Sequence, residues 1–96
     1  MAQKRVQSPA TLAFKRLRAE WKAAHGAWFA ATQDAGHVAG SDQWVAREAA
    51  WDALQDATDA VAGINDPKAR LAALMACPNA SVREAARLAS ARQEVA

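Results

Sequence analysis

Three side chains in this 96-residue sequence are the clearest candidates for a nucleophile, a base or a metal ligand: His25, His37 and Cys77. The two histidines stand twelve residues apart, and the cysteine lies forty residues beyond the second. Catalytic pairs and metal sites need such groups in close spacing, and no C-x-x-C, H-E-x-x-H or glycine-rich phosphate loop occurs. The sequence therefore predicts a chain that is not an enzyme and that uses no metal and no cofactor.

Cations gather at the start of the chain, where residues 1–25 carry a net charge of +5. Lys15, Arg18 and Lys22 recur at three- and four-residue spacing, so they share one face of a helix. Lys4 and Arg5 precede them. Such a face can contact nucleic acid phosphates or an acidic partner, with an affinity that falls as salt rises. Nucleic-acid binding is therefore the alternative function, although the chain contains no recognised nucleic-acid-binding motif.

Acids gather in the middle of the chain, where residues 26–66 carry a net charge of −6. Glu48, Asp52, Asp56 and Asp59 form a ladder at helical spacing. One interpretation is that this acidic face imitates a phosphate backbone. The other is that the acidic and basic helices flank a common seam, where their opposite charges fix orientation and register. The sequence leaves both interpretations open.

Four tryptophans predict how the chain folds. Trp21 and Trp28 are seven residues apart, and so are Trp44 and Trp51. If two helices fold back on each other about Gly36, residue i meets residue 72 minus i, which sets Trp28 against Trp44 and Trp21 against Trp51. One apolar seam then runs the length of an antiparallel helical hairpin.

Helix-start signals divide the remaining sequence. A Ser-Pro pair at 8–9 and an Asp-Pro pair at 66–67 each place a capping residue before proline, and Ser81 with Glu84 forms a capping box. The predicted fold is all-α, an antiparallel long-helix hairpin plus a second short helical hairpin, in one small four-helix domain over residues 1–96. Its segments are a flexible arm at 1–7 and helices at 8–33, 41–62, 66–76 and 80–94.

The second hairpin has a recognisable pattern in residues 71–92, which read LAALMACPNASVREAARLASAR. The residues that carry the pattern after its Pro-Asn turn are Val82, Arg83, Ala85 and Ala86. This segment resembles one unit of the HEAT-like or leucine-rich-variant helical repeats. The resemblance covers less than a quarter of the chain, residues 1–65 hold no second copy, and a solenoid needs about three stacked units. It therefore implies a helix-turn-helix packing unit.

The apolar residues are mostly small, because 28 of them are alanines and only 21 are large. A core this thin makes an isolated monomer marginal, so we expect a homodimer or a bound partner. No stretch approaches the roughly 18 consecutive apolar residues that cross a bilayer, so we expect no membrane association. The first residues lack the apolar run of a signal peptide, and the single cysteine cannot form an internal disulfide, which favours a cytoplasmic protein.

The tip of the predicted hairpin supplies the leading site. Phe29 follows Trp28 and Val45 follows Trp44, so both point about 100° away from the seam. Either the two short helices fold over this tip, or the residues form with Val38 an exposed patch of the composition found in protein-binding hot spots. We call these five residues the tip patch. Its rim would consist of His25, His37 and Asp42.

The leading functional hypothesis is a small non-enzymatic protein that binds another protein through the tip patch, as an inhibitor or an assembly factor. The abundance of alanine and arginine is typical of GC-rich genomes and favours a bacterial, phage or plasmid source. The third class considered is a purely structural subunit of a larger assembly.

Overall fold

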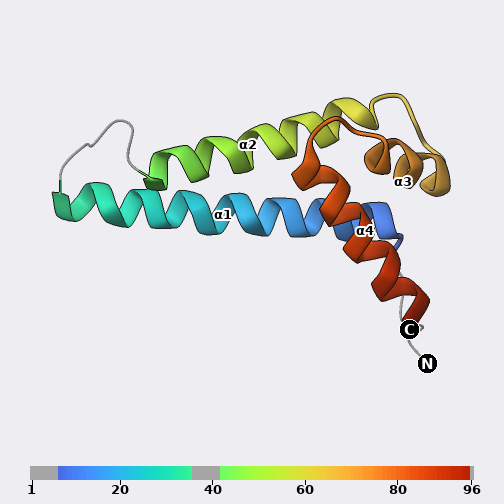
Figure 1. Cartoon of the computed structure of the whole chain (residues 1–96), viewed down its shortest axis with the longest axis horizontal. Helices are drawn as coiled ribbons and strands as arrows, with labels where there is room; N and C mark the ends of the chain where they lie inside the picture. The colour runs from blue at the N-terminus through green and yellow to red at the C-terminus, as the bar shows by residue number, and fades with distance from the viewer. Residues whose placement is uncertain (1–6, 36–41, 96) are drawn as a thin grey trace.

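The computed structural model describes residues 7–35 and 42–95, nearly all of them in helices (Figure 1). The helices are α1 (Pro9–Ala35), α2 (Asp42–Ala60), α3 (Pro67–Met75) and α4 (Ala80–Val95). No strand occurs in the two described ranges, and the predicted all-α fold is confirmed. Each helix end lies within two residues of its predicted position. Several predictions concern residues outside the described ranges: those for Lys4, Arg5, His37 and Val38, the turn about Gly36, and all but the last residue of the flexible arm at 1–7.

Side-chain caps begin two helices where the proline signals predicted them. The Ser8 hydroxyl accepts a hydrogen bond from the Thr11 amide at 3.2 Å, and the Asp66 carboxylate accepts one from the Ala69 amide at 2.9 Å. Proline follows each capping residue, at a position where an amide proton would have no partner inside the helix. Local sequence is therefore sufficient to set the start of α1 and of α3.

The start of α4 differs from the prediction. Asn79 is the capping residue, because its side-chain oxygen accepts a hydrogen bond from the Ser81 amide at 2.9 Å. Ser81 lies inside the first turn of the helix, and Glu84 pairs with Arg87 at 2.6 Å. The predicted Ser81–Glu84 capping box is therefore wrong. Asparagine caps a helix at least as well as serine, and here it stands two residues earlier.

The tryptophans pair across α1 and α2 in the predicted register. The ring centroids of Trp28 and Trp44 lie 5.7 Å apart, and those of Trp21 and Trp51 lie 5.6 Å apart. Both pairs are tilted, at 57° and 53°, as aromatic rings prefer. α1 and α2 are therefore an antiparallel hairpin in which residue i faces residue 72 minus i.

The buried core lies at the end of the hairpin where α3 and α4 pack against α1 and α2 (Figure 1). Its members are Ala10, Ala13, Leu17, Ala53, Ala57, Val61, Leu74, Cys77, Val82, Ala85, Ala86 and Ala89. Seven of these twelve are alanine, whose small side chain lets helix backbones approach closely. The alanine content that made the core look thin is thus what allows four helices to meet at this end.

The other half of the hairpin has no such core. Beyond Leu17 on α1 and before Ala53 on α2, none of the side chains described is fully buried. We call this part, residues 18–33 and 42–52, the two-helix arm. Figure 1 shows that α3 and α4 lie at the opposite end of the hairpin, so of the two alternatives for the tip, the one in which these helices fold over it is wrong. The radius of gyration is accordingly 15.7 Å, whereas a compact chain of this length has about 12.5 Å.

Candidate interaction surface

Two of the four tip-patch residues that the structure describes are exposed. Phe29 is 53% exposed and Val45 is 59% exposed, while Trp28 and Trp44 between them are half-buried. Trp28 and Trp44 face each other, and the next residue on each helix is rotated by about 100°. In antiparallel helices these two rotations point to the same side of the hairpin. Phe29 and Val45 therefore lie on one face, beside the tryptophan pair. Asp42, a predicted rim residue, is also exposed.

Arg47 holds the tryptophan pair together. Its guanidinium carbon lies 4.8 Å from the ring centre of Trp28 and 5.2 Å from that of Trp44, within the range of cation–π attraction. Its Nε donates a hydrogen bond to Nδ1 of His25 at 3.0 Å, and its Nη1 lies 3.0 Å from a Glu48 carboxylate oxygen. The tip is thus fixed by one arginine of α2 that contacts four side chains, two of them on α1. His25, predicted as a rim residue, belongs to this internal network.

The second tryptophan pair is less enclosed than the seam geometry predicted. Trp21 stacks on His25 with ring centres 5.2 Å apart and an angle of 18°, and its indole N–H is buried without an acceptor among the residues described. Trp51 is 42% exposed. Two helices alone can cover only one side of a ring this large, so the pair remains partly open to solvent.

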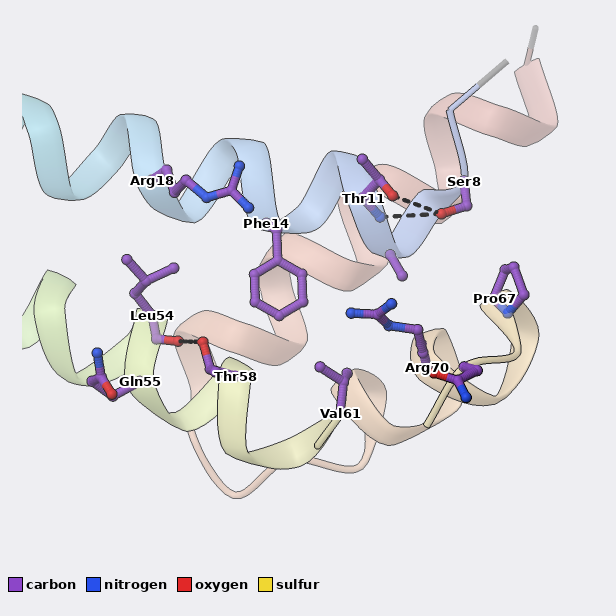
Figure 2. A pocket seen from close by; sticks show the side chains of 12 residues that line it. Ser8, Thr11, Phe14, Arg18, Leu54, Gln55, Thr58, Val61, Pro67 and Arg70 are labelled. Atoms are coloured by element: carbon purple, nitrogen blue, oxygen red, sulfur yellow. Dashed lines mark hydrogen bonds between the residues drawn. The ribbon is translucent and has the colours of Figure 1, made fainter. Parts of the chain in front are cut away.

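A groove runs along one face of the hairpin, between α1 and α2. Toward the core end its lining includes Phe14, Arg18, Leu54 and Thr58, around a hollow of about 500 Å³ that Figure 2 shows from close by. Arg18 and Leu54 also line a second hollow, which continues into the arm. The further side chains around that second hollow include Trp21, Lys22 and Trp51. The groove therefore leads from the core end of the hairpin toward the tip patch.

α4 covers the opposite side of α1. Leu12 and Arg16 of α1 border Ala85 and Leu88 of α4. They precede the groove residues Phe14 and Arg18 by two positions each, which is about 200° around the helix. The groove face is consequently the side of the hairpin that α4 leaves open.

The basic residues of α1 form one rim of this groove. Lys15, Arg18 and Lys22 all line the second hollow and are all exposed. The Lys15 ammonium donates a hydrogen bond to the Gln7 side chain at 2.9 Å. The structure therefore brings the three predicted cations together on one face, as their spacing predicted.

The acidic ladder of α2 divides into two parts. Gln55 lines the groove, and Asp52 and Glu48 stand three and seven residues before it, which places them on the same side of α2. Asp56 and Asp59 instead border a separate hollow beside Cys77 and Pro78, and the Asp56 carboxylate accepts a hydrogen bond from Asn79 at 2.9 Å. The ion pairs found within the described ranges do not join α1 to α2. The charges thus face outward along the two rims instead of pairing across the seam.

The remaining reactive groups are not assembled into a site. Cys77 is buried in the core, and its sulfur lies 4.0 Å from the Asp56 carbonyl oxygen. The described residues contain no cluster of three or more histidine, cysteine or carboxylate groups arranged for a metal ion. No helix in the described ranges is long and apolar enough to span a membrane.

Comparisons of the chain with protein-family models, with curated proteins and with solved structures gave no match. The function must therefore be argued from the surface itself. Sequence reasoning placed Trp51 inside the seam and missed that it borders, with Leu54, an open groove. The lengths of the predicted helices are the signal that could have found this groove. α3 and α4, with 9 and 16 residues, are only about 14 and 24 Å long, whereas α1 is about 40 Å long. Two such short helices leave part of the long hairpin uncovered.

Proposed function

We propose that this chain is a small interaction protein, without catalytic activity of its own, that binds another protein chain through the open face of the two-helix arm. The observation that carries the proposal is the exposed pair Phe29 and Val45 beside the tilted Trp28–Trp44 pair. Exposed aromatic residues gathered at one place are the composition of a protein-binding hot spot.

The arm has a second property that suits binding. Arg47 fixes both tip tryptophans through cation–π contacts and is itself tied to His25 and Glu48. A patch already held in one arrangement loses less side-chain freedom when a partner arrives, which favours affinity. A small domain of this kind would serve as an inhibitor or an assembly factor, since it offers a binding face and no assembled catalytic site among the residues described.

Nucleic-acid binding is the alternative, and the basic rim of Lys15, Arg18 and Lys22 is what favours it. The groove weakens this alternative, because Glu48 and Asp52 stand along its other rim and would repel phosphates. We expect no electrophoretic mobility shift with duplex DNA, single-stranded DNA or RNA at low salt. A shift that disappears in Lys22→Glu would favour the alternative.

Photo-cross-linking tests the proposed function directly. The chain would carry benzoylphenylalanine at position 29 and be irradiated in a soluble extract of the cells that encode it. The matched control carries the same group at position 75, since Met75 on α3 is an apolar residue of similar exposure, 41%. We expect discrete protein adducts from position 29 that are absent from position 75.

Alanine variants provide the second arm of this experiment. Phe29→Ala and Val45→Ala should each reduce the capture of the cross-linked partner while the helical content by circular dichroism stays unchanged. Met75→Ala should leave capture unchanged. Identical adducts from positions 29 and 75 would contradict the proposal, because the arm would then bind nothing selectively.

A further inference from the structure

The open face of the hairpin is divided lengthwise by charge. Its α1 rim carries Lys15, Arg18 and Lys22. Its α2 rim carries Glu48 and Asp52, which stand two helical turns and one helical turn before the groove residue Gln55. Between the rims lie apolar side chains from both helices, which are Phe14, Trp21, Trp51 and Leu54. A partner that fits this face must present an apolar strip with acids along one edge and cations along the other.

A second copy of this chain presents such a surface. We infer that the open faces of two copies pack on each other about a two-fold axis parallel to the hairpin, so that α1 of each copy lies on α2 of its partner. The four long helices then form a bundle around the tryptophans. This inference rests on the proposed function, because it names the first occupant of the same face.

The direction of the axis follows from the charges. Closed dimers are usually two-fold symmetric, and the axis in the contact plane can lie across the helices or along them. An axis across the helices sets α1 on the partner's α1, which brings Lys22 and Arg18 toward the partner's cations. An axis along the helices sets the basic rim of each copy on the acidic rim of the other. Only the second arrangement avoids facing like charges, which are costly at an interface.

The hairpin register fixes which residues meet. Residue i of α1 is level with residue 72 minus i of α2, and a two-fold axis parallel to the hairpin keeps that level in the partner copy. Lys22 is therefore level with position 50 of the partner's α2. It faces the partner's Asp52, which lies two residues further along that helix. Phe29 is level with position 43, one helical turn or less from the partner's Val45. The exposed apolar residues thus meet each other, as do the opposite charges.

The shape of the chain agrees with a missing partner. The smallest dimension of the chain is 23 Å, little more than the width of two helices, which are about 10 Å each. α4 lies on the opposite side of α1, so it leaves the face accessible to a second copy.

Charge reversal in sedimentation equilibrium tests this arrangement. We expect the wild-type chain to dimerise and Lys22→Glu and Asp52→Lys each to weaken the dimer by roughly tenfold or more, since each sets like charges together twice. An equimolar mixture of the two variants should recover wild-type affinity, because both junctions of the mixed dimer then pair opposite charges. Lys68→Glu makes the same charge change on α3 and should have no effect.

Disulfide trapping gives a second readout that does not depend on weakening the dimer. A chain with Phe29→Cys mixed with a chain with Val45→Cys should form a mixed disulfide dimer under mild oxidation, in preference to either self-linked product. Predominant linkage of position 29 to position 29 would show that the axis does not lie along the hairpin and would overturn the inference.

The outcomes separate this inference from the proposed function. A wild-type chain that stays monomeric at millimolar concentration overturns the dimer, and protein adducts from position 29 would still support the proposed function. A dimer insensitive to both reversals, or not restored by mixing them, overturns the arrangement of helices inferred here. A nucleic-acid shift abolished by Lys22→Glu without dimerisation would assign the basic rim to the other class of partner. A monomer without selective adducts defeats both proposals.

Discussion

Arg47 should determine the stability of the two-helix arm, and Arg47→Met measures how strongly. The substitution removes cation–π contacts to two rings, worth about 0.5 to 1 kcal/mol each at exposed sites. It also removes the hydrogen bond to His25, worth about 1 kcal/mol, and a half-exposed ion pair to Glu48 that contributes little. A methionine sulfur against the rings returns about 0.5 kcal/mol. The expected net loss is therefore about 2 kcal/mol, confined to the arm.

Native-state hydrogen exchange resolves this loss residue by residue. Amides of the arm, at residues 20–33 and 45–52, should lose about 2 kcal/mol of opening free energy, and core amides around Ala57 and Val82 should lose much less. The samples should be dilute enough to be monomeric by sedimentation, so that dimerisation does not protect the arm. Arg47→Lys keeps a cation near the rings but cannot reproduce the planar fork, and we expect about half the effect.

The reasoning fails if Arg47→Met changes arm protection by less than about 0.5 kcal/mol, the usual range of a neutral surface substitution. It also fails if arm and core lose protection equally. Equal loss would mean that the hairpin unfolds as one unit, and that the absence of fully buried side chains in the described part of the arm does not lower its local stability. Glu48→Gln is the control for the ion pair alone and should stay within that same small range.

Three further predictions concern single sites. Gly26→Ala should raise the free energy of unfolding by about 1 kcal/mol, because an added Cβ meets nothing within 4 Å and alanine favours helix. Gly63→Ala should lower the free energy of unfolding by about 1 kcal/mol, because the φ of 77° at this position suits glycine. Urea unfolding measures both changes. Leu74→Ala should cost about 2 to 5 kcal/mol in thermal or urea unfolding, because the residue is fully buried. The hydrogen bond from Arg87 lowers the pKa of Glu84, so Arg87→Gln should raise that pKa toward its ordinary value in an NMR titration of the carboxyl carbon.

The hairpin and its register could be predicted because the signals are one-dimensional. The seven-residue spacing of Trp21 with Trp28, and of Trp44 with Trp51, fixes both the helical face and the fold line. Cap signals likewise depend on neighbours within one turn, which is why Ser8 and Pro9 were sufficient to find the start of α1. Each of these features is decided by residues that are close in sequence or by a single mirror relation between two helices.

The position of α3 and α4 could not be predicted in this way, because it depends on surface shape. Tryptophans at the tip offer the larger apolar area, and area alone favours the tip as the place to dock. Ala13 of α1 and Ala53 and Ala57 of α2 instead leave a shallow surface that admits another helix, and Ala85 and Ala86 of α4 meet it. Close approach of alanine-faced helices gains many contacts that an area estimate misses.

The same division gives the two ends of the hairpin different roles. The alanine end is closed by α3 and α4 and needs no partner, while the tryptophan end keeps its largest side chains partly in water. Substitutions at Phe29 or Val45 remove little buried area in the free chain, so they should alter association without unfolding the core. Substitution at Leu17 or Leu74 should instead unfold the core, and association should be lost as a consequence. If the proposed function holds, stability and recognition are separable in this fold, because they then depend on side chains at opposite ends of the same two helices.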